Sequence, residues 1–231
     1  RSPVLGAPLK RFDATAALKQ PGVVDVVEIR TGVAIVAQSY WQARKAASAL
    51  ELDWEKTELA SWSSDSIYQK FTQTLNDSSQ KGLKCCDEGE GDKLLNQAQH
   101  VVSADYYAPY LAHATMEPMN CTAQVKDGKV DIWVPTQVPQ MARDMAAKVA
   151  KVDVTQVTVH VTQLGGGFGR RLEVDFVGQA VQVAMACEGQ PVQLSWSREE
   201  DMKHDFYRPM HLAKFQASLD DKGQVSSLRI K

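Results

Sequence analysis

The sequence predicts an α+β fold in which helices pack on mixed sheets. Some apolar runs alternate with period two, as in residues 157–161, where valines alternate with polar side chains; this is typical of a half-buried strand. Other runs repeat at helical spacing, as in residues 176–187. A connection with four glycines, residues 163–171, joins these two runs. The sequence therefore predicts a strand, a glycine-rich turn and a helix in succession.

The composition is that of an ordinary globular protein. Of 231 residues, 44% are hydrophobic and 23% are charged, and this length suits one large or two small domains. The formal net charge of −2 gives no global field that favours nucleic acid or an anionic membrane. No apolar run approaches the length that a bilayer-spanning helix needs. We therefore expect no nucleic-acid partner and no membrane-spanning segment.

The pattern of residues 1–57 predicts a compact βαβ-like unit. Its expected elements are strands at 23–29 and 33–37, a helix after Ser39, and a short strand at 52–54. Ser39, followed three residues later by Gln42, forms a capping-box pattern that starts a helix. No side chain here suggests chemistry, so we expect this unit to serve as scaffold.

Residues 58–99 predict a helix and a polar linker. Ile67, Phe71 and Leu75 share one face of a helix. Residues 76–92 are polar and contain glycine, which is typical of an exposed connection.

The cysteines and histidines form no recognised metal site. The four cysteines are Cys85, Cys86, Cys121 and Cys187. None has zinc spacing, and the adjacent pair Cys85-Cys86 is either redox-active or an exposed pair in a loop. His204 and His211 are seven residues apart, which is not a ligand spacing. We therefore assign no metal ligand.

Residues 100–231 predict a strand-rich domain. The expected strands are 100–107, 122–126, 129–134, 157–161, 192–196, 213–219 and 225–230, with helices from about 139 to 151 and from about 176. Asp127-Gly128 predicts a type I′ turn between two of the strands. Pro139 fits the first turn of a helix, which places Gln137 near a helix start.

Residues 109–120 mix apolar and ionisable side chains without a clear period. One interpretation is a buried, irregular segment that lines a site. The other is a core crossover in which His113 and Glu117 are simply hydrogen-bonded. Both remain open from the residues alone.

The glycine-rich turn is the candidate site. Glycine lacks a Cβ, so the backbone can approach a ligand closely, and N–H groups near a helix start attract anions. Arg170 and Arg171 add forked donors suited to phosphate or oxyanion groups. The alternative is a tight turn whose arginines are only solvated. A Rossmann fingerprint needs glycine at Arg170 and a P-loop needs Gly-Lys-Ser/Thr, so neither nucleotide motif is present.

Five motifs follow in order: AHATMEP at 112–118, PTQVPQ at 135–140, GGGFGRR at 165–171, SREEDM at 197–202 and FYRP at 206–209. In this order they resemble the molybdenum-binding large subunit of the xanthine dehydrogenase and aldehyde oxidase family. The resemblance is closest to the isoquinoline 1-oxidoreductase beta-subunit type and covers nearly the whole chain except the polar linker. It implies that 1–57 is a partial hammerhead domain. It also implies that 100–231 is an incomplete first molybdopterin-binding domain.

The resemblance implies a molybdenum hydroxylase, which oxidises an aldehyde or an N-heteroaromatic substrate with oxygen derived from water. It implies molybdopterin in its cytosine dinucleotide form. It further implies two partners: a small 2Fe-2S subunit that carries iron–sulfur clusters, and the remainder of the large subunit. Gln137 matches the glutamine near the molybdenum oxo group. The cofactor-binding residues expected by this match are Gln137, Gly166, Gly167, Phe168, Gly169 and Arg170.

Two departures and one absence narrow these expectations. Arg170 replaces a glycine that many members carry, which the isoquinoline type tolerates. Leu172 stands where purine hydroxylases carry a substrate-binding glutamate, which favours aldehydes or apolar heteroaromatics. No segment matches the family's catalytic glutamate base, which lies near the far C-terminus. We therefore expect no catalytic residue in this chain. We also expect the chain to be a piece of a longer protein and to be inactive by itself.

Three points stay open at this stage. Proteins of the isoquinoline type are often exported to the periplasm, so a periplasmic full-length protein is one expectation. The chain could be a non-catalytic module that binds an anion, a cofactor or another subunit. It could also be a phosphate-binding domain for another nucleotide.

Overall fold

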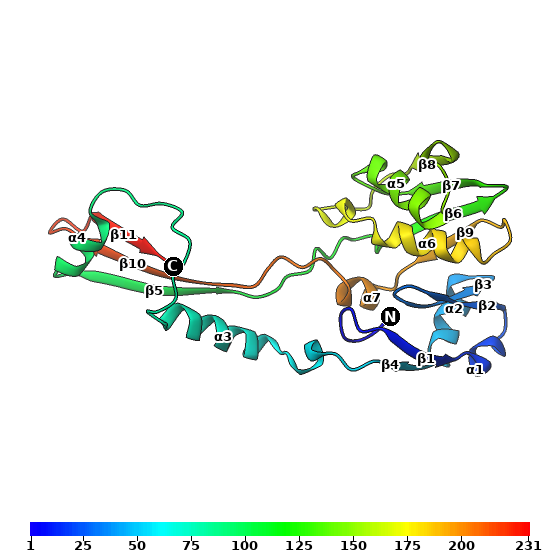
Figure 1. The fold of residues 1–231 in the computed structure, drawn as a ribbon, viewed down its shortest axis with the longest axis horizontal. Helices are drawn as coiled ribbons and strands as arrows, with labels where there is room; N and C mark the ends of the chain where they lie inside the picture. The colour runs from blue at the N-terminus through cyan, green and yellow to red at the C-terminus, as the bar shows by residue number, and fades with distance from the viewer. The chain divides into compact units, whose positions relative to one another are not determined.

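The computed structural model describes residues 1–231 and divides into two compact units (Figure 1). Unit 1 comprises Arg1–Ala60 and Ala112–Phe206, and unit 2 comprises Ser61–Leu111 and Tyr207–Lys231. Both units mix helices and strands, which confirms the predicted α+β class. The units follow contacts in space, whereas the predicted domains 1–57, 58–99 and 100–231 are sequence ranges. That domain division stays a prediction.

The N-terminal part of unit 1 contains two small antiparallel sheets. Its elements are β1 (Leu9–Asp13) paired with β4 (Glu51–Trp54), β2 (Val23–Ile29) paired with β3 (Gly32–Ala37), and helices α1 (Thr15–Leu18) and α2 (Tyr40–Ala47). A 3-10 turn, η1 (Glu58–Ser61), follows. Ser39 Oγ accepts a hydrogen bond from the Gln42 N–H (3.4 Å), which confirms the predicted helix cap. No sequence pattern predicts β1, because its residues, LKRFD, show no clean alternation.

The larger part of unit 1 is built on a four-stranded mixed sheet of order β8-β7-β6-β9. Its strands are β6 (Asn120–Lys126), β7 (Lys129–Val134), β8 (Val157–Val161) and β9 (Val192–Ser195). β6 and β7 form the predicted hairpin, and both Asp127 (φ 50°) and Gly128 (φ 72°) have the positive φ that a type I′ turn requires. β7 and β8 are parallel because α5 (Pro139–Ala150) and η2 (Val154–Gln156) connect them as a crossover.

Helix α6 (Asp175–Met185) supplies the core that holds this sheet. Its buried residues join the inward-facing residues of β7 in one apolar cluster that includes Phe176, Val177, Val130, Ile132 and Val134. Each such side chain contributes about 1.5–3 kcal/mol relative to exposure. The glycine-rich turn lies between β8 and α6, so this core fixes both of its ends.

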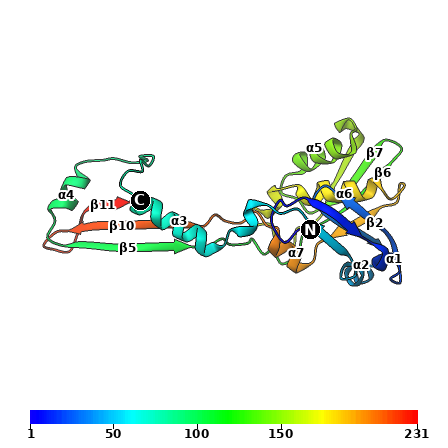
Figure 2. The same ribbon diagram turned by 60° about the horizontal axis from the view of Figure 1, so that its bottom comes forward.

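Unit 2 is a three-stranded antiparallel sheet with two helices. The strands are β5 (Val101–Ala108), β10 (His211–Leu219) and β11 (Val225–Ile230), in the order β11-β10-β5, and the helices are α3 (Ser64–Asn76) and α4 (Gly91–Gln97). β5 and β10 run side by side over eight paired positions (Figures 1 and 2). Ser63 caps α3 through a capping box with Ser66. No helix of the structure combines the length and apolar character that crossing a membrane requires.

Candidate functional site

The glycine-rich turn adopts a backbone that few side chains tolerate. Gly166 and Gly169 both have φ near 99°, and Phe168 between them has φ 53°. A non-glycine residue with positive φ is costly and is retained where the surrounding structure enforces it. The Phe168 side chain is 77% exposed, so its conformation does not serve core packing. The turn thus presents its backbone and one aromatic ring to solvent.

The turn does not lead straight into α6, which differs from the strand–turn–helix succession that the sequence predicts. It continues into a 3-10 turn, η3 (Arg170–Leu172), and α6 begins only at Asp175, whose carboxylate occupies the first turn of the helix. The glycine N–H groups therefore do not belong to the helix start. The anion-binding effect of a helix dipole is not available to them.

Gln137 approaches this turn from the segment that precedes α5. Its side-chain Oε1 accepts a hydrogen bond from the Gly169 N–H (3.2 Å), and its backbone N–H donates to the Arg171 carbonyl (3.1 Å). A Cβ on Gly167 would lie 2.7 Å from the Gln137 Oε1, so only glycine permits this approach. The Gln137 side-chain N–H₂ makes no hydrogen bond within the protein and remains free to donate.

Both arginines that follow the turn are buried, in contrast to either interpretation of the sequence. Arg171 is fully buried; its guanidinium donates to the carbonyls of Gly166 (2.8 Å), Pro135 (3.1 Å) and Glu117 (2.9 Å). It also pairs with the Glu117 carboxylate at 2.8 Å. Burial lowers the pKa of Arg171, and the Glu117 charge opposes that effect. Arg171 therefore ties three chain segments together behind the turn.

Arg170 is held in the same way by two carboxylates. Its two terminal nitrogens donate to both oxygens of Asp175 (3.0 and 2.9 Å), a bidentate pair. Its Nε lies 3.1 Å from the Asp205 Oδ1. The angle at Nε does not meet hydrogen-bond geometry, so this contact is chiefly an attraction between charges. The Arg170 side chain supports the turn from inside, and the contact with a cofactor expected for Arg170 stays a prediction.

Residues 112–120 pack against the turn, and His113 and Glu117 are both hydrogen-bonded; that the segment lines a site stays a prediction. Glu117 Oε2 accepts from the Gly165 N–H (2.9 Å), and the Glu117 N–H donates to the Gly165 carbonyl (3.0 Å). His113 is hydrogen-bonded to Asp205 through its backbone N–H and its ring Nδ1. The segment thus lies against the turn, with Glu117 bound to Gly165 and His113 bound to Asp205.

No clear sequence pattern identifies two further residues that hold the turn and residues 112–120 in place. Asp205 lies in an irregular stretch without periodicity, although an acid among apolar and aromatic neighbours is a weak signal of a buried ion pair. Arg198 stands in a run of charged residues that is typical of a solvated face, but it donates to the carbonyls of Thr115 (2.5 Å) and Met116 (2.8 Å). It also pairs with the buried Asp201 at 2.7 Å, at the start of α7 (Arg198–Lys203).

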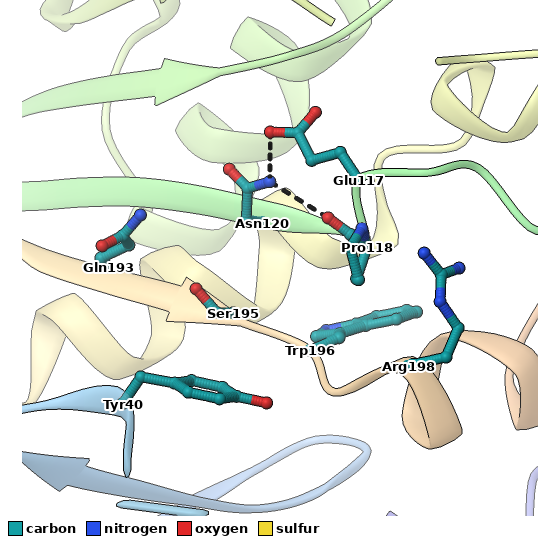
Figure 3. Close-up of a pocket in the computed structure, with 8 residues that line it drawn as sticks. All are labelled: Tyr40, Glu117, Pro118, Asn120, Gln193, Ser195, Trp196 and Arg198. Atoms are coloured by element: carbon teal, nitrogen blue, oxygen red, sulfur yellow. Dashed lines mark hydrogen bonds between the residues drawn. The ribbon is translucent and has the colours of Figure 1, made fainter. Parts of the chain in front are cut away.

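An open groove of about 370 Å³ lies beside this segment (Figure 3). Its lining residues are Tyr40, Glu117, Pro118, Asn120, Gln193, Ser195, Trp196 and Arg198. Figure 3 shows the Asn120 amide between the Glu117 carboxylate (2.9 Å) and the Pro118 carbonyl (3.1 Å). The lining offers hydrogen-bonding groups but no hydrogen-bonded pair of nucleophile and base.

The turn and Gln137 together fit a bound organic cofactor. The missing Cβ of Gly167 lets Gln137 reach the turn, the Phe168 ring is exposed, and the Gln137 amide has free donors. Of the six residues predicted to bind cofactor, the structure brings three into contact with one another: Gln137 lies against Gly167 and Gly169. Gly166 and Phe168 lie in the same turn, and Arg170 is directed inward.

Comparison with known proteins identifies the family of this chain. A family model described as a molybdopterin cofactor-binding domain matches residues 75–231. The beta chain of isoquinoline 1-oxidoreductase from Brevundimonas diminuta is 28% identical over 229 residues, which cover 96% of this chain and 29% of that protein. A nicotinate dehydrogenase chain from Pseudomonas putida is 27% identical, over 96% of this chain and 18% of that protein. The chain spans less than a third of either relative.

Solved structures share the fold. Quinoline 2-oxidoreductase from Pseudomonas putida 86 superposes with a TM-score of 0.72 at 18% identity, over 100% of this chain and 34% of that chain. The aldehyde oxidoreductase from Desulfovibrio gigas gives a TM-score of 0.69 at 17% identity, over 95% of this chain and 28% of that chain.

Proposed function

This chain belongs to the molybdopterin cofactor-binding domain family, and from that premise we propose that it is part of a molybdenum hydroxylase large subunit. The whole protein would oxidise aldehydes or N-heteroaromatic compounds with oxygen taken from water. Relatives named for isoquinoline and nicotinate oxidation, and solved structures named for quinoline and aldehyde oxidation, support this substrate class. This chain contributes part of the cofactor site.

The observation that carries the proposal is the contact between Gln137 and the glycine turn. The Gly169 N–H holds the Gln137 Oε1 at 3.2 Å, which orients the amide and leaves its two N–H donors free. Gly167 has no side chain to obstruct that amide. A donor fixed at bare backbone is suited to bind an oxygen of a cofactor placed there.

Bound molybdopterin supplies the two-electron chemistry, and the protein positions it. The residues proposed to bind it are Gln137, Gly166, Gly167, Phe168, Gly169 and Arg170. Arg171 and Glu117 act behind them, because their ion pair and backbone hydrogen bonds fix the turn against residues 112–120. This prearranged backbone would contribute binding without the cost of ordering a loop.

The cytosine dinucleotide form of the cofactor and a small 2Fe-2S subunit are further parts of the proposal. Two relatives are named as single subunits of larger enzymes, which supports the presence of other subunits. We also propose that the catalytic base and the rest of the cofactor site lie in parts of the large subunit outside this chain. The chain by itself should then turn over no substrate.

The test is metal and pterin analysis of the full-length protein, with turnover of aldehydes and quinoline-type compounds in ¹⁸O-labelled water. We expect close to one molybdenum and one pterin per large subunit, and label in the oxidised product. A folded full-length protein with neither metal nor pterin would instead identify a non-catalytic module. Turnover by the 231-residue chain alone would contradict the proposed division of the site.

A further inference from the structure

His113 is held in one orientation by Asp205. The His113 backbone N–H donates to Asp205 Oδ2 (2.5 Å), and the ring Nδ1 lies 2.9 Å from Asp205 Oδ1. The Asp205 carboxylate, with its side chain 3% exposed, also faces the Arg170 guanidinium at 3.1 Å. Asp205 accepts from the His113 backbone N–H and faces the Arg170 cation, so its carboxylate is also the acceptor in the contact with the His113 ring. The ring must therefore carry its proton on Nδ1.

The other ring nitrogen of His113 points at the glycine turn. A Cβ built on Gly169 would lie 3.5 Å from the His113 Nε2 and 3.9 Å from its Cδ2, and meets nothing else within 4 Å. Nε2 has no hydrogen-bond partner in the protein, and the side chain is 23% exposed. With Nδ1–H donated to Asp205, Nε2 is the ring nitrogen left to face a ligand, and in this tautomer it carries a lone pair that can accept a hydrogen bond.

The backbone next to His113 is strained, and the glycine that it faces has positive φ. Ala114, next to His113, has φ 48°, and Gly169 has φ 99°. A left-handed alanine is unfavourable and persists where the surroundings enforce it. Here the enforcing contacts are the Asp205 bonds to His113 and the Arg198 bonds to Thr115 and Met116. These contacts hold the imidazole beside Gly169 at the cost of the strain at Ala114.

We propose that His113 is a further cofactor-binding residue, whose Nε2 accepts a hydrogen bond from an N–H or O–H group of the cofactor beside Gly169. Asp205 is the positioning residue that fixes the ring. Gln137 and His113 then flank the same glycine. Gln137 accepts from the Gly169 N–H and would donate its side-chain N–H groups to the cofactor, whereas His113 would accept from the cofactor. This inference rests on the proposed function, because it assumes that the site takes molybdopterin.

Two substitutions separate this role from a purely structural one. His113→Asn places an amide nitrogen two bonds from Cβ, as in Nδ1, so it keeps the donation to Asp205 and removes Nε2. His113→Gln places its amide three bonds from Cβ, as in Nε2, so it keeps the acceptor and weakens the bond to Asp205. His160→Asn is the matched control, because His160 also pairs with an aspartate, Asp131 (3.0 Å), but its ring stacks on Trp133 of β7 instead of facing Gly169.

The experiment measures molybdenum and pterin retained by each full-length variant after dialysis, together with the melting temperature of the cofactor-free protein. We expect His113→Asn to keep that melting temperature and to bind cofactor about tenfold more weakly, the effect of one hydrogen bond. His113→Gln should retain more cofactor than His113→Asn, and His160→Asn should match the wild type.

Several outcomes would overturn the inference. Wild-type cofactor retention in His113→Asn would overturn it alone and leave the proposed function intact. A parallel loss of melting temperature and cofactor in both His113 variants would assign His113 a structural role only. A wild-type protein without molybdenum or pterin would refute the proposed function, and this inference with it.

Discussion

Arg170 and Asp205 form an ion pair inside the protein, with the Arg170 Nε 3.1 Å from the Asp205 Oδ1 and side chains only 1% and 3% exposed. Asp205 also orients His113, and Arg170 also binds Asp175. The pair therefore couples the glycine turn to residues 112–120. Removing Asp205 would leave the buried Arg170 with Asp175 alone, and removing Arg170 would leave the buried Asp205 carboxylate without a cation; either change costs more than the pair itself contributes.

Replacing Asp205 with asparagine tests this coupling. We expect the change to destabilise the region locally by about 3–5 kcal/mol, because Arg170 loses one of its two carboxylates in a buried setting. Amide hydrogen exchange should accelerate in both coupled segments, 112–117 and 165–171. Asp53→Asn is the control: Asp53 pairs with Arg11 at 3.3 Å on the surface, with side chains 44% and 81% exposed. Its effect should stay within about 1 kcal/mol; equal effects would refute the coupling.

Replacing Arg171 with lysine should disrupt the turn although the charge is kept. Lysine cannot serve the separate acceptors of Gly166, Pro135 and Glu117 with one ammonium group. We expect a loss of roughly 3 kcal/mol or more in stability, read from the melting temperature of the full-length protein. Arg143→Lys, which gives up a single bond to the Val157 carbonyl, should cost about 1 kcal/mol. A tolerated Arg171→Lys would show that the guanidinium fork is dispensable.

Gly167→Ala should displace Gln137 with little loss of stability. The new Cβ would lie 2.7 Å from the Gln137 Oε1, and the movable end of that side chain must give way. We expect lower molybdenum and pterin content at a nearly unchanged melting temperature. Gly82→Ala, where a Cβ meets nothing within 4 Å, is the control and should retain full cofactor. Normal molybdenum and pterin content in Gly167→Ala would show that cofactor binding does not depend on the close approach of Gln137 to the turn.

Gln137→Ala should lower turnover in the full-length protein more than it lowers stability. The side chain is exposed and makes one hydrogen bond within the protein, so its loss should cost about 1 kcal/mol of stability. Losing a donor aimed at the cofactor should lower aldehyde turnover by about tenfold or more. Steady-state kinetics and melting curves give the comparison. Equal losses in both would contradict the role assigned to Gln137.

Cys121 should resist alkylation in the folded protein. Burial raises its pKa to about 12, from 9.0 for an ordinary thiol, because the thiolate is poorly solvated in the core. Above pH 9 the unfolded chain loses this proton while the folded chain keeps it. The thiol therefore reduces stability by about 1.4 kcal/mol per pH unit as the pH rises.

Mass spectrometry after iodoacetamide treatment at about pH 9, near the ordinary thiol pKa, provides the measurement. We expect rapid labelling of the exposed Cys85 and Cys86, and labelling of Cys121 only after denaturation. Labelling of Cys121 at the rate of Cys85 under native conditions would show that the core opens readily.

Local sequence patterns determined much of what this chain is. The valines of 157–161 and the apolar spacing after residue 175 give β8 and α6, and Asp127-Gly128 gives the β6–β7 hairpin, because these signals act between near neighbours. The order of motifs, with the glycine turn among them, was sufficient for the family. The elements that carry the motifs could also be predicted, since most motifs lie at the end of a predictable strand or helix.

The tertiary structure alone decided where the arginines of the turn go and what His113 faces. Arg171 meets Glu117, 54 residues earlier, and Arg170 meets Asp205, far along the chain in the other direction. No local pattern relates such distant residues, and a long charged side chain next to a turn can point to solvent or to the core with equal ease. The difference lies in whether distant carboxylates and carbonyls arrive to offset the cost of burying the charge, and that depends on how the whole chain packs.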